Sequence, residues 1–128
     1  MKADHMAFEV SDMDRAIAFY TEVLELPLLS RQVDEGHGEA FAFVGVEGCN
    51  IELLQLLNGP RFSGATIRPS YCPHFAIGVD DLDQVVQRLA EKNVYPVKGP
   101  LEITGMVRWV YFADPDNNII EFVQWMRP

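Results

Sequence analysis

The chain contains an internal repeat, and this repeat constrains its fold more than any other feature. When the 128-residue sequence is shifted against itself by 69 positions, residues 5–14 align with residues 74–83, and five of the ten pairs are identical. The same shift aligns Glu52 with Glu121, so a histidine and a glutamate recur at equivalent places in both halves. A repeat of this length predicts two copies of one supersecondary unit that share a domain.

Each half has the same order of predicted elements. A strand over residues 5–10 or its equivalent precedes an aspartate suited to cap a helix. The apolar residues that follow have helical spacing, at Met13, Ala16, Ile17, Tyr20 and Leu24 in the first half and at Leu82, Val85, Val86 and Leu89 in the second. Three strand-like runs come next, at about 28–33, 39–45 and 50–57, and again at about 94–103, 106–113 and 119–125.

These elements predict an α+β fold of two tandem βαβββ units. The first unit covers residues 1–57 and the second covers residues 74–128, and together they make one domain. Residues 58–73 between them are rich in Gly, Pro, Ser and Arg, which is typical of a linker.

Composition and charge exclude several classes of partner. The formal net charge of −9 would repel nucleic acid and anionic membranes. No apolar run approaches the length of about 20 residues that spans a bilayer, and the first residues lack the apolar stretch of a secretory signal. Two cysteines, Cys49 and Cys72, are too few for a disulfide framework and fit no paired-cysteine zinc spacing. We therefore expect a cytoplasmic protein that acts on a small molecule.

The paired histidines and glutamates are candidate metal ligands. Side chains alternate across a strand, so His5, Ala7 and Glu9 share one face of the first strand, opposite its bulky apolar residues. Glu52 and Glu121 each interrupt a strongly hydrophobic strand, where an uncompensated carboxylate costs several kcal/mol. Two imidazoles and two carboxylates suit Zn, Ni, Co, Fe or Mn and leave coordination positions open for catalysis.

Two other interpretations of these four residues stay open at this point. Each residue alone is compatible with a surface or capping role. The pairs could also descend from a metal-binding ancestor without binding metal now. The third histidine, His37, lies in a turn flanked by glycines, and we expect it to face solvent.

The sequence also resembles a known family. The paired His/Glu pattern, residues 12–20 (DMDRAIAFY) and residues 114–121 (DPDNNIIE) resemble the vicinal oxygen chelate superfamily, and within it the glyoxalase I branch. This resemblance covers nearly the whole chain. It implies that each βαβββ unit curls into half a barrel and that a metal lies where two units face each other. By position, His5, Glu52, His74 and Glu121 match the four metal ligands of that family.

Some positions depart from the glutathione-dependent members of the branch. Those enzymes carry a basic residue on the first strand and an asparagine after the fourth-strand ligand, where this chain has Glu9, Gln55 and Leu56. Asn118 stands where the family turn often has glycine. The resemblance therefore predicts the fold and the metal site but leaves the substrate open.

The resemblance implies a divalent-metal-dependent lyase or isomerase of glyoxalase I type. Such an enzyme transfers a proton next to a carbonyl through a metal-bound enediolate, with Glu121 as the base and Glu52 as a second candidate. The residues expected to line the substrate pocket are apolar or aromatic ones on the strands, namely Leu54, Leu56, Trp109, Val123 and Trp125.

Two alternatives come from other branches of the same superfamily. One is a non-catalytic binding protein that sequesters a drug, for which the acidic composition would suit a cationic ligand. The other is an extradiol-type dioxygenase, which would require iron and would leave Glu52 off the metal. In every case we expect a homodimer, because units with open edges can close within a chain or across a two-fold axis.

Overall fold

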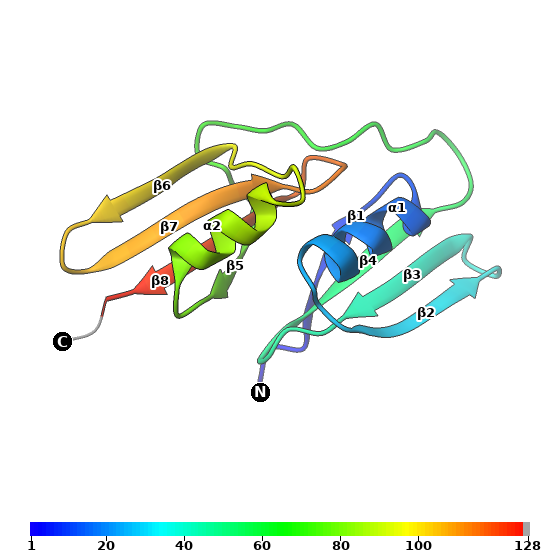
Figure 1. Cartoon of the computed structure of the whole chain (residues 1–128). Helices are drawn as coiled ribbons and strands as arrows, with labels where there is room; N and C mark the ends of the chain where they lie inside the picture. Colours follow the sequence, from blue (N-terminus) through cyan, green and yellow to red (C-terminus); the bar gives the residue numbers. More distant parts are fainter. Residues whose placement is uncertain (127–128) are drawn as a thin grey trace. The chain divides into compact units, whose positions relative to one another are not determined.

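The computed structural model describes residues 1–126. The chain forms two compact units, and the boundary between them lies between Ala65 and Thr66. Figure 1 shows that each unit is a four-stranded sheet with helical structure on one face. The predicted α+β fold of two tandem βαβββ units is therefore confirmed. The last two residues of the predicted second unit, 127 and 128, lie outside the described residues.

In the first unit, the first and last strands lie side by side. Its elements are β1 (His5–Glu9), α1 (Met13–Ala18), η1 (Phe19–Val23), β2 (Leu28–Asp34), β3 (Glu39–Val44) and β4 (Asn50–Leu56). The strand order is β1-β4-β3-β2, and β1 runs parallel to β4 while the other pairs are antiparallel. This order brings the histidine of β1 beside the strand that carries Glu52.

The second unit repeats this topology. Its elements are β5 (His74–Gly78), α2 (Leu82–Ala90), β6 (Lys98–Ile103), β7 (Val107–Ala113) and β8 (Ile119–Trp125). The strand order is β5-β8-β7-β6, with β5 parallel to β8. A shift of 69 residues carries β1 onto β5 and β4 onto β8 without any change of bounds.

Each sheet buries one face under its helix. In the first unit α1 packs on β3 and β4, and the residues beneath it are fully or almost fully buried: Phe8, Val10, Ala42, Val44, Ile51 and Leu53. In the second unit α2 packs on β7 and β8, over the buried side chains of Val110, Phe112, Ile120 and Phe122. Since side chains alternate along a strand, the histidines and glutamates lie on the opposite face of each sheet.

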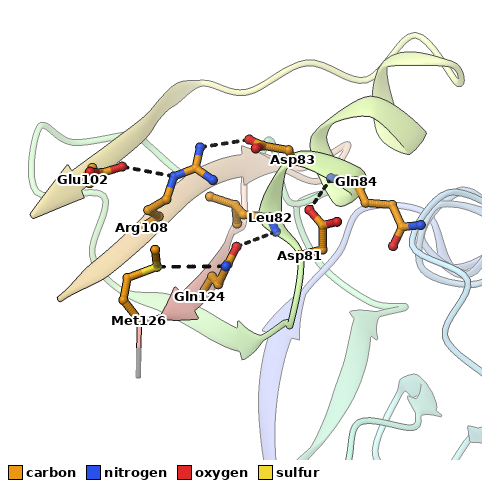
Figure 2. Close-up of polar contacts among 8 residues, drawn as sticks. All are labelled: Asp81, Leu82, Asp83, Gln84, Glu102, Arg108, Gln124 and Met126. Carbon is orange, nitrogen blue, oxygen red and sulfur yellow. Dashed lines mark hydrogen bonds and ion pairs between the residues drawn. The ribbon is translucent and has the colours of Figure 1, made fainter. Parts of the chain in front are cut away.

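A glutamine near the end of the last strand anchors each helix. The Gln55 amide oxygen accepts a hydrogen bond of 2.9 Å from the backbone N–H of Met13, the first residue of α1. In the second unit Gln124 accepts a bond of 2.8 Å from the backbone N–H of Leu82, as Figure 2 shows. These bonds satisfy one of the N–H groups that every helix leaves unpaired at its start, and they fix the helix relative to the strand that carries the glutamate.

Capping and ion pairing hold α2 further. Asp81 caps the helix by accepting a hydrogen bond from the Gln84 backbone N–H at 3.1 Å. Arg108 on β7 donates to Asp83 at 2.9 Å and lies 3.3 Å from Glu102 of β6 (Figure 2). The guanidinium therefore links the helix to two strands of its sheet.

Two elements differ from the sequence prediction. Helical spacing predicts a helix that continues to Leu24, but α1 ends at Ala18 and is followed by the wider π-turns of η1. The Thr21 hydroxyl donates to the Ile17 carbonyl at 2.8 Å, and a side-chain bond of this kind competes with the α-helical pattern. The strand predicted from residue 94 begins at Lys98, because the Val94 N–H is bonded to the Leu89 carbonyl of α2 at 2.9 Å and not to a neighbouring strand.

The predicted linker, residues 58–73, contains no helix or strand, and the structure describes all of it. None of the helices in residues 1–126 is long and apolar enough to cross a membrane. The cytoplasmic location stays a prediction.

Candidate functional site

In the first unit His5 and Glu52 form a close pair on the face of the sheet opposite α1. The parallel pairing of β1 with β4 places Ala7 opposite Glu52. His5 precedes Ala7 by two residues on β1, so its side chain is on the same face of the sheet as Glu52. His5 Nε2 is 3.3 Å from Glu52 Oε1, and the Glu52 side chain is only 16% exposed. His5 Nδ1 is 2.7 Å from Asp4 Oδ2, so both ring nitrogens face a carboxylate.

The second unit contains the same pair in the same register. Ala76 of β5 lies opposite Glu121 of β8. His74 Nε2 is 2.8 Å from Glu121 Oε1, with side-chain exposures of 22% and 13%. His74 Nδ1 is 2.8 Å from the backbone carbonyl oxygen of Tyr71. In both units, therefore, Nδ1 is held by an oxygen and Nε2 faces the glutamate.

The hydrogen bond at Nδ1 determines what His74 can do at Nε2. A carbonyl oxygen can only accept, so Nδ1 carries the proton that is donated to Tyr71. In the neutral imidazole, Nε2 then presents a lone pair to the Glu121 carboxylate, which is also an acceptor. A second ring proton, or a cation bound by both groups, satisfies this contact. Histidines that bind metals through Nε2 are oriented in this way by an oxygen at Nδ1.

The spacing of the donor atoms fits a divalent transition metal. Two ligands at about 2.1 Å from a metal and at right angles to each other have donor atoms about 3 Å apart, and the two pairs are separated by 2.8 and 3.3 Å. Within residues 1–126 there is no group of three or more His, Cys, Asp or Glu side chains that could hold a metal ion. Each unit on its own thus brings together two of the four candidate ligands predicted from the sequence.

The Asp4 carboxylate raises the pKa of His5. The hydrogen bond to Asp4 is the main cause, and the charge of Glu52 acts in the same direction. A raised pKa keeps the ring protonated at higher pH in the metal-free protein. Protons and metal ions therefore compete for Nε2 over a wider pH range than at an ordinary histidine.

Aromatic residues flank the pair in the first unit. Phe43 of β3 is the cross-strand partner of Glu52, and its ring meets that of His5 edge-on, with the centroids 5.1 Å apart. Phe41 lies two residues earlier on the same strand, 6.2 Å from Phe43. Together they form an apolar wall beside the carboxylate.

The second unit places a phenol at the equivalent position. Tyr111 of β7 is the cross-strand partner of Glu121, and its ring centroid is 5.3 Å from that of His74. Tyr71 stacks on Tyr111 with the centroids 4.8 Å apart and the planes 12° apart. Burial is the main cause that raises the pKa of Tyr111, and the charge of Glu121 adds to it. The hydroxyl therefore stays protonated and can donate a hydrogen bond next to the candidate base.

The residues predicted to line a substrate pocket differ in exposure. Leu54 and Leu56 share the face of β4 that carries Glu52, the former half-buried and the latter half-exposed. Trp109 and Val123 are cross-strand partners in the second unit, and Val123 is buried, whereas Trp125 at the end of β8 is 59% exposed. Their role in binding a substrate stays a prediction. His37 is exposed, as expected, and pairs with Asp34 at 2.8 Å.

Three features of the site were not predicted from the sequence. Asp4 directly precedes His5, and this adjacency is a signal that could have been used. The Tyr71 contact is made by a backbone carbonyl, which has no signature in the sequence. The repeat of 69 residues does not align Phe43 with Tyr111, because the equivalent positions of β3 and β7 are 68 residues apart.

Comparison with known proteins identifies the family. The model of the Glyoxalase/Bleomycin resistance protein/Dioxygenase superfamily matches residues 2–122, nearly the whole chain. The chain belongs to this superfamily. The predicted resemblance to the vicinal oxygen chelate proteins is thereby confirmed.

Relatives within this superfamily carry different activities in their names. The chain is 32% identical over 126 residues to a probable lactoylglutathione lyase of Vibrio parahaemolyticus, covering 94% of this chain and 88% of the relative. It is 35% identical over 121 residues to the metallothiol transferase FosB of Staphylococcus epidermidis, covering 92% and 78%. It spans only 43% of the length of the Arabidopsis thaliana lactoylglutathione lyase, to which it is 32% identical.

A similar solved structure is named as a binding protein. TnmS3, an antibiotic binding protein from Streptomyces sp. CB03234, matches with a TM-score of 0.72 and 26% identity, covering 98% of this chain and 96% of that protein. The proteins that are similar to this chain thus include named enzymes and a named binding protein.

Proposed function

We propose that the protein is a divalent-metal-dependent lyase or isomerase of glyoxalase type. In this proposal His5, Glu52, His74 and Glu121 together bind one divalent cation of the group Ni, Co, Zn, Mn or Fe. The two pairs come from the two units of one chain or from units of two chains in a homodimer. The relatives named lactoylglutathione lyase and metallothiol transferase support a metal-dependent enzyme that acts on a small molecule.

One observation carries the proposal. In each unit an imidazole fixed at Nδ1 turns Nε2 towards the oxygen of a mostly buried glutamate, at the same strand register. If the two His–Glu contacts were ion pairs with only a structural role, they would require opposite charges but no particular orientation of the imidazole. The repeated orientation of Nδ1 and Nε2 is what a metal ligand requires and what a simple ion pair does not.

The residues of the site have distinct roles in this reaction. A bound divalent cation would supply Lewis acidity that polarises a substrate carbonyl. Glu121 removes the proton from the carbon next to that carbonyl and returns it to the neighbouring carbon. The Tyr71 carbonyl keeps the His74 ring in place beside Glu121, and the Tyr111 hydroxyl can donate to a substrate oxygen. Glu52 is the second candidate base.

An apolar surrounding is expected to keep water away from the transferred proton. The predicted lining residues are Leu54, Leu56, Trp109, Val123 and Trp125. Excluding water strengthens the electrostatic interactions of the site. We do not expect glutathione to be held by the positions used in the glutathione-dependent branch, since Glu9 and Leu56 carry the wrong chemistry for it.

The test is a substrate screen of the metal-loaded protein that includes the hemithioacetal of methylglyoxal and glutathione. With an active substrate in hand, Glu121→Gln should lose most of the activity, at least about a hundredfold for a missing acid–base group. Glu47→Gln, at an exposed loop position, should keep it. A fully active Glu121→Gln enzyme would show that Glu121 is not the base.

A ligand-binding protein without catalysis is the second candidate function. The match to the antibiotic binding protein TnmS3 over almost the whole of both chains favours it. The net charge of −9 and the rings of Phe41, Phe43, Trp109 and Tyr111 would suit an aromatic or cationic ligand. A chain purified without metal that binds such a drug and turns over no substrate would favour this candidate, whereas a stoichiometric transition metal lost in His5→Ala would favour the enzyme.

A further inference from the structure

The first unit contains a cavity of about 350 Å³ at the carboxyl ends of β1 and β4. It is lined by residues 10–12 after β1, by residues 55–57 at the end of β4, and by Gly59, Arg61 and Phe62 of the following segment. All of these residues belong to the first unit. A volume of this size lies at the lower end of the range for small-molecule pockets, so it suits a compact ligand.

Most polar side chains of this cavity are already used within the protein. Asp12 Oδ1 accepts from the Arg15 backbone N–H at 3.0 Å, and Ser11 Oγ accepts from Arg15 Nη2 at 2.9 Å. The Gln55 amide accepts from the Met13 backbone N–H and donates to the Ser11 carbonyl at 3.2 Å. These groups shape the cavity and offer little to a ligand.

Arg61 differs from the other polar residues of the cavity. Its side chain is exposed, and it forms no hydrogen bond or ion pair with any other residue in the range 1–126. A guanidinium presents five N–H donors in a planar fork that matches a carboxylate. Arg15 does not line the cavity, and its guanidinium donates to the Ser11 hydroxyl, so Arg61 is the cation among the lining residues. The cavity therefore has donors available for an anion, although Asp12 also lines it.

The remaining walls of the cavity are apolar. Leu56 and Leu57 are 50% and 46% exposed, and Phe62 is half-buried. An apolar ligand that covers these exposed leucines removes apolar surface from water, which favours binding. A ligand that satisfies both parts of the cavity combines one carboxylate with a compact apolar body.

We infer that this cavity binds a small carboxylate with an apolar or aromatic body, and that Arg61 pairs with the carboxylate. Leu56 lies four residues along β4 from Glu52, which corresponds to about 13 Å of strand. The lining of the cavity does not include His5 or Glu52, and Leu56 is the one residue that it shares with the predicted substrate pocket. The inference does not depend on metal binding by His5 and Glu52.

Titration of the metal-free protein with 3-phenylpropionate tests this inference, followed by amide NMR signals. The expected result is saturable shifts at residues 10–12 and 55–62, with 3-phenylpropanamide, the uncharged analogue, binding about tenfold more weakly or less. Shifts that are absent, unsaturable or the same for both probes would overturn the inference.

A matched pair of variants identifies the cation. Arg61→Gln should weaken 3-phenylpropionate binding about tenfold, because a charge-assisted hydrogen bond to the carboxylate is lost. Arg68→Gln, a second exposed arginine of residues 58–73 that does not line the cavity, should leave the affinity unchanged. The spectrum of each variant reports its fold. An Arg61→Gln protein that is folded and binds 3-phenylpropionate as tightly as the parent would contradict the assignment.

Discussion

Phe43 and Tyr111 occupy the same position in the two units of the repeat. Each is the cross-strand partner of a candidate glutamate, and each turns its ring towards a candidate histidine at 5.1 and 5.3 Å. The first unit places a phenyl ring there and the second a phenol. The two halves therefore contain the same pair of candidate ligands, but only the second has a phenol as the cross-strand partner of its glutamate.

The ionisation of Tyr111 tests this arrangement. Burial and the charge of Glu121 raise its pKa above the ordinary value of 10.0, so Glu121→Gln should lower the pKa without restoring that value. Because the pKa is raised in the folded protein, the resulting stability is present below pH 10 and is lost as pH rises through the folded pKa. Phenolate absorbance measures this step, and Tyr111→Phe identifies it. A Glu121→Gln protein with an unchanged Tyr111 titration would contradict the contact.

The pKa of His5 should depend on Asp4. In the metal-free protein Asp4→Asn removes the largest cause of the raised pKa, so the pKa should fall towards 6.5. The stability that the protonated His5 gains from Asp4 is present below pH 6.5 and is lost as pH rises through the pKa of His5 in the folded protein. NMR titration of the imidazole signals measures the shift. His37, whose pKa is raised by Asp34, is the internal control, and a parallel change there would point to a general effect instead.

The glutamine that anchors each helix should contribute to stability. Gln124→Ala leaves the Leu82 backbone N–H without its 2.8 Å partner, and we expect a loss of about 1–2 kcal/mol in the free energy of unfolding. Gln124→Glu keeps an acceptor at this position and should lose less. Urea denaturation compares the two variants. Equal losses would mean that the acceptor oxygen does not anchor α2.

The turn before β8 depends on Asp114. Its buried carboxylate accepts hydrogen bonds from the backbone N–H groups of Asp116 and Asn118 through Oδ1, both at 2.8 Å. Asp114→Ala should therefore cost about 2–4 kcal/mol in the free energy of unfolding, because two buried donors lose their acceptor. Asp114→Asn retains Oδ1 and should recover part of this loss. Thermal unfolding provides the comparison, and a neutral Asp114→Ala substitution would be inconsistent with the buried network.

Much of the scaffold could be predicted from the sequence because its signals are local. Alternation in residues 5–10 correctly placed Phe8 and Val10 under the helix and His5 on the other face. Asp12 caps α1 as expected, and its counterpart Asp81 in the repeat caps α2, each accepting from the backbone N–H three residues later. These features depend on side-chain periodicity and on one polar group at a fixed place.

Other features depend on contacts that residue types do not encode. The early end of α1 involves a hydroxyl bond from Thr21 to a backbone carbonyl, and the support of His74 is again a backbone carbonyl. The aromatic neighbours of the glutamates depend on strand register, which a one-residue offset between the halves conceals. The cavity beside Arg61 is built partly from residues 58–73, where neither helical nor strand periodicity predicts a conformation.

The metal content of the purified protein tests the central claim most directly. We predict about one divalent transition-metal ion per chain in protein prepared without added metal. Each of His5→Ala, Glu52→Gln, His74→Ala and Glu121→Gln should lose this ion, while His37→Ala should keep it. A protein without stoichiometric metal, or a metal content that none of the four substitutions changes, would contradict the account.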